Sequence, residues 1–231
     1  MGIVGLSAAG GWAATAHVPA LAALDGYELR ALSASTAESA KAAGGKYGVA
    51  LAFGAAEELA ACDEVDLVVV TVRVARHREP VLAALSAGKP VLCEWPLAVD
   101  LAEAHELAAF ASDRRVRTAV GLQGRSAPVV RYLRDLVGEG YVGDVLSTTL
   151  VASAGAWGAT FLPREPFLLD REGGNTMLNV AVGHLADSLA MCLGEFAELS
   201  AVMANRRSHA RETSAPTAAV RGLSTATTRG A

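Results

Sequence analysis

The sequence predicts an α/β protein, with a doubly wound parallel sheet in its N-terminal part and a smaller α/β (α+β) domain after it. Two observations predict the sheet. Over the first half of the chain, short apolar runs alternate with alanine-rich helical stretches, which is the pattern of βαβ units. One run, VDLVVVTV at residues 65–72, is apolar on both faces, as a central strand covered by helices on both sides should be.

The elements of this first part alternate between strands and helices. Strands are expected, in chain order, at Gly2–Leu6, Tyr27–Ser33, Val65–Val72, Val91–Glu94 and Arg117–Gly121. Helices are expected at Ala16–Ala23, Thr36–Tyr47, Ala55–Ala60, Arg78–Ala87 and Leu101–Ser112. Gly48 and Gly88 give stop signals after the second and fourth helices, and Asp100 is a suitable N-cap for the fifth.

After Gly121 the pattern changes. Ser126–Val137 has the character of a helix, and Asp144–Ser153 alternates like a strand of a second sheet. A further helix is expected at Met177–Leu193 and a strand at Leu199–Met203. Two strands rarely form a stable unit alone, so we expect this second domain to be incomplete, which a truncated or frame-shifted C-terminus would explain.

The expected organisation is residues 1–121 for the parallel sheet, 122–205 for the second domain and 206–231 for a tail. The tail holds five arginines and a single acid, Glu212. It shows neither a helical nor a strand period and almost no large apolar residues. We therefore expect the tail to be disordered.

Composition argues against several classes of function. A net charge of -4 and a pI near 5.7 speak against direct binding to nucleic acid or to an anionic membrane surface. No apolar run reaches the ~18 residues that cross a bilayer, and the N-terminus lacks the basic region of a secretion signal. Cys62, Cys93 and Cys192 have no metal-ligand spacing, so we expect reduced thiols in a cytoplasmic protein without a metal site.

A glycine turn follows the first strand. Residues 5–11 read GLSAAGG, and a strand, a glycine turn and a helix form the setting in which the diphosphate of NAD or NADP lies on backbone N–H groups. Ser7 stands where the usual motif has its middle glycine, and its hydroxyl could donate to a phosphate. An ordinary glycine-rich turn explains the pattern equally well.

The second expected strand ends in LRALSAST, without the carboxylate that commonly binds the adenosine ribose. Ser33 and Ser35 could offer hydroxyl groups there. A neutral turn would not repel a 2′-phosphate, so NAD and NADP both remain open. The alternative is a turn in which Thr36 caps the following helix.

Five segments, in this order, carry a family resemblance. They are GIVGLSAAGGW, VVVTVRVARH, AGKPVLCEWPLA, GLQGR and VGHLAD. The chain resembles the Gfo/Idh/MocA oxidoreductases over residues 2–205, and within them the branch of the fungal galactose-regulon repressor, while the tail matches nothing. The resemblance implies a Rossmann domain that binds NAD or NADP and an α/β domain that forms the substrate site and often a dimer interface. It implies a sugar-like substrate, a homo-oligomer if the second domain is complete, and a protein partner if the chain is regulatory.

The chain departs from the catalytic members of this family at two positions. Those members read E-K-P at the central motif, and their lysine binds substrate and assists proton transfer, whereas this chain has Trp95 there. An indole has one N–H and no accessible basic nitrogen. Members also commonly have an aspartate four residues before the active-site histidine, where this chain has Val180. His184 is retained and Asp187 lies three residues on, so the two could form a catalytic pair; a buried histidine that serves packing is the alternative.

Other residues are candidates for the cofactor or substrate site. His77 resembles a family histidine beside the nicotinamide, or simply begins a helix. Arg125 could meet a substrate anion or Glu94, or form a surface ion pair. Trp12 could stack on a ligand or belong to the core. The full set of expected cofactor contacts is Gly5, Ser7, Gly10, Gly11, Trp12, Ser33, Ser35, Val72, His77, Glu94, Trp95 and Arg125.

Two functions follow from these features. The first is an NAD(P)-binding oxidoreductase of sugar or polyol substrates with an altered catalytic site. The second is a catalytically silent NAD(P)-binding regulator of sugar metabolism that acts through a protein partner. A third interpretation, in which the glycine turn serves packing alone, ranks lowest.

Overall fold

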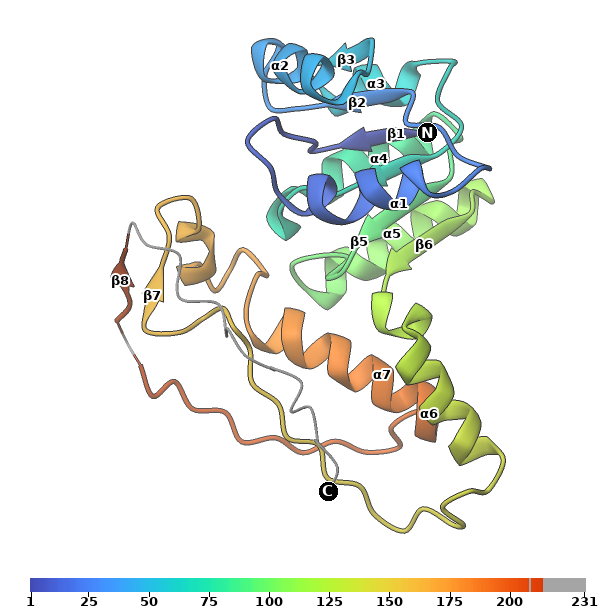
Figure 1. Cartoon of the computed structure of the whole chain (residues 1–231), viewed down its shortest axis with the longest axis vertical. Coiled ribbons are helices and arrows are strands. Elements are labelled where there is room, and N and C mark those ends of the chain that lie inside the picture. The colour runs from blue at the N-terminus through green and yellow to red at the C-terminus, as the bar shows by residue number, and fades with distance from the viewer. Residues whose placement is uncertain (208, 214–231) are drawn as a thin grey trace, which may run out of the picture.

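A six-stranded parallel sheet forms the first lobe of the protein, as a computed structural model that describes residues 1–207 and 209–213 shows (Figure 1). The strands are β1 (Gly2–Val4), β2 (Ala31–Ser33), β3 (Leu51–Phe53), β4 (Val68–Val70), β5 (Val91–Glu94) and β6 (Thr118–Gly121). Their order in the sheet is β3-β2-β1-β4-β5-β6. The order reverses between β1 and β4, and such a reversal opens a crevice for a ligand at the carboxyl ends of the strands.

Helices cover both faces of this sheet, which confirms the doubly wound architecture. The helices of the first lobe are η1 (Ala13–His17), α1 (Val18–Ala22), α2 (Ala37–Tyr47), α3 (Ala56–Ala61), η2 (Val74–Arg76), α4 (Arg78–Ser86) and α5 (Leu101–Arg114). The α3, α4 and α5 helices pack against one another on one face, and α2 lies along β2 and β3.

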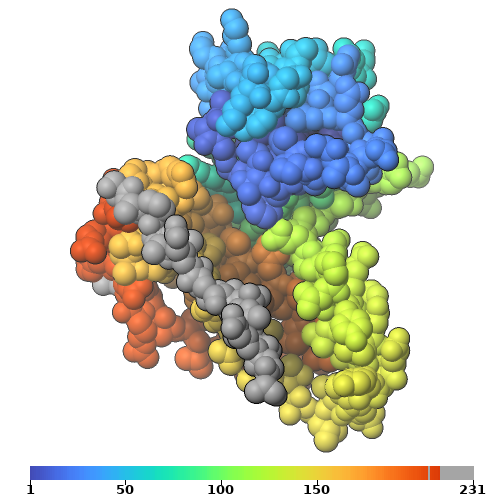
Figure 2. Space-filling model, viewed as in Figure 1, coloured from blue at the N-terminus to red at the C-terminus, as the bar shows by residue number. Residues whose placement is uncertain are grey.

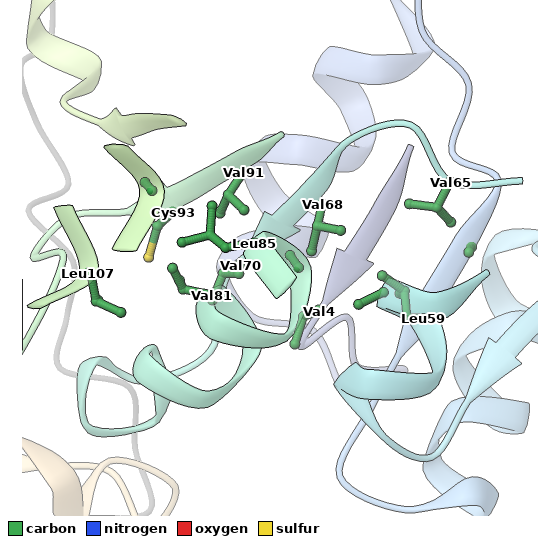
Figure 3. Close-up of a cluster of buried hydrophobic side chains, with 14 of the residues drawn as sticks. Val4, Leu59, Val65, Val68, Val70, Val81, Leu85, Val91, Cys93 and Leu107 are labelled. Atoms are coloured by element: carbon green, nitrogen blue, oxygen red, sulfur yellow. The ribbon is translucent and has the colours of Figure 1, made fainter. Parts of the chain in front are cut away.

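The strand residues alternate between two apolar cores. Val4, Val68 and Val70 enter the larger core, beside residues of α3, α4 and α5 (Figure 3). Their neighbours Ile3 and Val69 enter the second core, on the side of α1 and α2. A central strand must therefore be apolar at successive positions, and burial of each such side chain contributes about 1.5–3 kcal/mol.

Local signals in the sequence fix several helix ends. The Thr36 hydroxyl oxygen accepts a hydrogen bond from the Ser39 N–H (3.1 Å), which begins α2. The Asp100 carboxylate accepts one from the Glu103 N–H (2.8 Å) at the start of α5. Gly48 ends α2 with φ at 70°, a conformation that favours glycine.

The second lobe is built mainly from two helices that pack side by side, α6 (Pro128–Gly138) and α7 (Gly183–Leu193) (Figure 1). The shorter helices η3, η4 and η5 cover Gln123–Ser126, Pro166–Leu169 and Leu178–Val182. Both long helices were expected. Two short parallel strands, β7 (Thr160–Phe161) and β8 (Arg211–Glu212), form a second sheet. Within the described ranges, no helix is both long and apolar enough to cross a membrane.

Three predictions about strands and the tail need correction, and one strand was missed. Leu51–Phe53 forms an edge strand that the sequence analysis did not identify. The segments 144–153 and 199–203 were expected to be strands and are not, because a strand needs a hydrogen-bonded neighbour as well as an alternating pattern. Residues 211–212, expected to be disordered, form β8. The rest of the expected tail from residue 214 onward, and residue 208, lie outside the described residues.

Candidate cofactor and substrate site

The turn after β1 depends on its glycines. Gly5, Gly10 and Gly11 have φ of 98°, 101° and 117°, values that side chains with a Cβ rarely adopt. A Cβ on Gly5 would lie 2.8 Å from Val72 Cγ1, so the turn passes close to the end of β4. At Gly10 and Gly11 a Cβ would meet nothing within 4 Å. The turn is thus open on the side of these two glycines, as a surface for a diphosphate must be.

Hydrogen bonds fix the shape of this turn. The Ser7 hydroxyl oxygen accepts from the Ala9 N–H (3.1 Å), and the Ser7 carbonyl accepts from the Gly10 N–H (3.1 Å) and the Tyr47 hydroxyl (3.0 Å). Lys46 Nζ donates to the Ala8 carbonyl (2.7 Å). Lys46 brings a positive charge to the turn. It could not be identified from the sequence, because it lies far along the chain in α2.

The end of β2 holds the two serines expected near the ribose. Ser33 is buried, and its carbonyl accepts from the Gly5 N–H (2.9 Å). Ser35 is exposed. Thr36 caps α2, which was the structural alternative for this turn. Of the two serines, Ser35 is therefore the one whose hydroxyl can reach a ligand.

Glu94 ends β5 and forms an ion pair that the sequence analysis missed. Glu94 Oε1 lies 2.6 Å from Nε2 of His17, a residue of η1, and the two side chains are 17% and 15% exposed. A Cβ on Gly121 would lie 2.9 Å from Glu94 Oε2, so this glycine on β6 makes room for the carboxylate. No spacing in the sequence could indicate the pair, because its members are 77 positions apart.

Trp95 links the first lobe to the second. Its Nε1–H donates to the Asn179 carbonyl in η5 (2.7 Å). A Cβ on Gly183 would lie 2.7 Å from the indole ring, so glycine at that position leaves space for the indole. The single N–H of Trp95 is therefore engaged within the protein.

His184 lies on α7 beside this indole. The ring centroids of His184 and Trp95 are 6.4 Å apart and the ring planes are inclined by 59°. The Nδ1 atom is buried and has no hydrogen-bond partner among residues 1–207 and 209–213. Burial lowers the pKa of His184, and the negative charges of Glu94 and Asp187 oppose that shift.

Asp187 pairs with Arg125 instead of His184. Arg125 Nε donates to both carboxylate oxygens (2.8 and 3.1 Å), and Nη2 donates to Oδ1 (2.6 Å). These contacts raise the pKa of Arg125. His184 and Asp187, expected as a catalytic pair, form no hydrogen bond in the described structure. Arg125 forms an ion pair, which was the alternative for that residue. In the part of the chain that the structure describes, Arg125 forms no hydrogen bond or ion pair with Glu94.

His77 follows η2 and is buried, with 1% of its surface exposed. Its Nε2 is 2.9 Å from the Val72 carbonyl and its Nδ1 is 3.3 Å from Cys93 Sγ. Burial raises the pKa of the Cys93 thiol to about 12, so the thiol keeps its proton. Nδ1 also lies 3.3 Å from the Leu97 carbonyl. His77 thereby supports the turn after β4. Trp12, in contrast, is 45% exposed at the glycine turn.

In comparisons with known proteins, two family models match the chain. Residues 1–122 match the model of the oxidoreductase family with an NAD-binding Rossmann fold, the Gfo/Idh/MocA family. Residues 128–222 match the model of the Gal80p C-terminal domain. The second match continues beyond residue 205, so the expectation that the tail matches nothing was wrong.

Individual relatives cover most of the chain. It is 39% identical to dehydrogenase aclE of Aspergillus oryzae over 76% of its own length and 48% of the relative's. It is 33% identical to 1,5-anhydro-D-fructose reductase of Ensifer adhaerens over 74% of the chain and 50% of the relative's. The chain thus spans about half the length of these curated relatives.

A regulatory protein is similar as well. The chain is 30% identical to the galactose/lactose metabolism regulatory protein GAL80 of Saccharomyces cerevisiae, over 89% of the chain and 50% of the relative. A crystal structure of a super-repressor mutant of that protein superposes with a TM-score of 0.77 at 29% identity, covering 83% of this chain and 52% of that one. With its first 122 residues matching the family model and its C-terminal region resembling Gal80p, the chain belongs to the Gfo/Idh/MocA oxidoreductase family.

Proposed function

We propose that this protein binds NAD or NADP at the glycine turn and oxidises or reduces a sugar- or polyol-type substrate slowly, with an altered set of acid/base groups. The observation that carries the proposal is the open turn at Gly10 and Gly11, next to the switch point of the sheet. When bound, the cofactor supplies the hydride chemistry. The protein supplies binding, orientation and proton exchange.

The residues of the turn fit a dinucleotide. Gly10 and Gly11 leave the backbone accessible, and the N–H groups that follow begin a helix, where the first amides have no intrahelical acceptor. Ser35 offers a hydroxyl for the ribose and Trp12 an exposed ring for stacking. Lys46 adds a positive charge beside the turn, which favours a diphosphate.

The substrate end of the site differs from an ordinary dehydrogenase site. Trp95 has no basic nitrogen, and its N–H is already bonded to Asn179. Loss of one acid/base group typically costs about 100- to 10,000-fold in rate, so slow turnover is expected. His184, whose Nδ1 is buried, would contact the substrate oxygen through Nε2. The similarity to a 1,5-anhydro-D-fructose reductase supports a sugar-like substrate.

A regulatory function is the second candidate, and two observations favour it. The C-terminal region matches the Gal80p C-terminal domain, and the Trp95 indole occupies space beside Gly183 in the substrate region. In this case the protein would bind NAD or NADP, sense a sugar and act through a protein partner.

Turnover of a panel of sugars and polyols, followed by absorbance at 340 nm with NAD and NADP, separates the two functions. The wild-type protein should turn over slowly, and Trp95→Lys should raise kcat by at least about tenfold, because it restores an exchangeable proton. Trp157→Lys is the matched control, since the Trp157 indole donates to another carbonyl of the second lobe, that of Asn175.

Each result has a distinct meaning. Saturable cofactor binding with no turnover in the wild-type protein or in Trp95→Lys would favour the regulator. Equal activity of Trp95→Lys and wild-type protein across the panel would contradict the account of Trp95. The absence of saturable binding of either cofactor would exclude both functions.

A further inference from the structure

The proposed oxidoreductase needs a group that exchanges a proton with the substrate hydroxyl, and Trp95 cannot be that group. This inference rests on the proposed function and concerns which residue takes that place. His184 lies beside the indole, and the negative charge of Glu94 acts on it. His17 is bonded to Glu94.

His184 is poorly arranged to act as a base. To accept a proton at Nε2, the ring must carry a hydrogen on Nδ1, and Nδ1 is buried without an acceptor in the described part of the chain. A buried N–H without a partner is unfavourable. The favoured form is therefore neutral, with its hydrogen on Nε2, and this form donates a hydrogen bond to a substrate oxygen.

The carboxylates near His184 are Glu94 and Asp187. Asp187 forms a bidentate ion pair with Arg125, so the oxygens of the Asp187 carboxylate already accept hydrogen bonds. Within residues 1–207 and 209–213, Glu94 is bonded through Oε1, to His17. Its Oε2 lies over the backbone of Gly121, where a side chain would collide with it. Among the described residues, Glu94 Oε2 thus has no hydrogen-bond partner at the carboxyl edge of the sheet, next to Trp95.

We propose that Glu94 is the catalytic group that exchanges a proton with the substrate hydroxyl, and that His17 is a positioning residue that holds the Glu94 carboxylate. During oxidation the O–H bond of the substrate breaks and its proton passes to Glu94 Oε2. The electron pair of that bond forms the C=O bond as hydride leaves the carbon for the oxidised cofactor. Reduction reverses these transfers.

The geometry assigns His17 its role because its Nε2 lies 2.6 Å from Glu94 Oε1 and both side chains are mostly buried. An Nε2–H that donates to Oε1 keeps the charged carboxylate in place and leaves Oε2 for the substrate. His17 also stands in η1, directly after the glycine turn, so it places the carboxylate relative to the cofactor surface.

The test compares Glu94→Gln and His17→Leu with His105→Leu, a matched control at an exposed histidine of α5. Glu94→Gln should lower kcat on the order of 100- to 10,000-fold and leave the Kd for cofactor, from fluorescence titration, within about threefold. His17→Leu should lower kcat about tenfold and move the acidic limb of the pH–rate profile to higher pH, because the carboxylate loses a hydrogen-bond donor. The control should change neither.

A second readout needs no cofactor. In the NMR spectrum of the free protein, the His17 ring C–H resonances should change position in Glu94→Gln and stay unchanged in His105→Leu. Unchanged His17 resonances in Glu94→Gln would overturn the proposal. So would Glu94→Gln with kcat within threefold of wild type, or His17→Leu with an unmoved acidic limb.

The remaining outcomes separate this inference from the proposed function. If either variant lost cofactor binding, the pair of Glu94 and His17 would serve to hold the helix in place. That result would contradict a catalytic role. Turnover that persists in Glu94→Gln would contradict this inference and leave the proposed function unaffected. A wild-type protein without turnover on any substrate would refute the proposed oxidoreductase function and the inference with it.

Discussion

His184 and Trp95 define the character of the site through what surrounds them. His184 has one ring nitrogen enclosed without a partner, and the indole beside it fills space that Gly183 leaves open. Burial of the histidine favours its neutral form, because a charged ring loses its hydration there. The site therefore contains a histidine that resists protonation.

This environment predicts a pH dependence of stability. The pKa of His184 is lowered from its ordinary value of 6.5 by burial, so below about pH 6.5 the unfolded chain binds the proton more readily than the folded one. The stability contribution is present above that pH and is lost as the pH falls through the lower folded pKa. The free energy of unfolding, from denaturant titrations at several pH values, should fall less steeply in His184→Asn than in wild-type protein.

His105→Asn is the control for this measurement, since it removes an exposed histidine. Its pH dependence should follow that of the wild-type protein. Equal slopes for His184→Asn and wild-type protein would show that His184 is not shielded from water as described.

At this scale the sequence analysis identified residues whose chemistry is local. Gly10 and Gly11 belong to a glycine-turn motif, and that motif predicts the conformation that they adopt. The pair of His17 and Glu94 could not be found in this way, because its members are far apart in sequence and the sheet topology alone brings them together. Asp187 was expected to pair with His184, but it pairs with Arg125. Helical spacing shows which side chains share a face of the helix, but it does not show which residue from another element competes for them.

Among the elements, α5 shows how local signals specify a boundary. The Asp100 side chain accepts from the Glu103 N–H at the first turn, and Arg115 ends the helix in a left-handed conformation with φ at 56°. The cap satisfies one of the N–H groups that have no intrahelical acceptor.

Asp100→Ala should therefore destabilise the protein by about 1 kcal/mol, measured as the change in free energy of unfolding in urea. Asp100→Asn should cost much less, because an asparagine caps almost as well. Asp113→Ala, near the opposite end of the same helix, is the matched control and should have little effect. An Asp100→Ala variant as stable as wild-type protein would contradict the capping role.

The elements also show where sequence patterns are insufficient. Leu51–Phe53 was missed because a three-residue edge strand is too short for a period to show. Segment 144–153 alternates convincingly, yet Leu146 and Val151 are almost fully exposed. Alternation records which face of a strand is apolar, while strand formation needs a neighbour whose position is a property of the whole fold.

On the scale of the whole molecule, two lobes meet at the carboxyl edge of the sheet. Figure 2 shows the first lobe, in blue and cyan, above the second, in yellow and orange. Trp95 bonds to Asn179 across this junction, and Gly174 packs so closely on Val74 that a Cβ would lie 2.8 Å from it. The first lobe followed from the sequence because βαβ units have strong local patterns, whereas the second lobe is held by contacts between distant segments.

The most direct test of the account is isothermal titration calorimetry with NAD and NADP. The wild-type protein should bind at least one of them saturably, and Gly11→Val should abolish binding, because a branched side chain is strained at φ of 117° and covers the open turn. Gly155→Val, at a glycine with open space and no positive φ, should bind like wild-type protein. Binding that survives Gly11→Val, or no binding by the wild-type protein, would contradict a coenzyme held at the glycine turn.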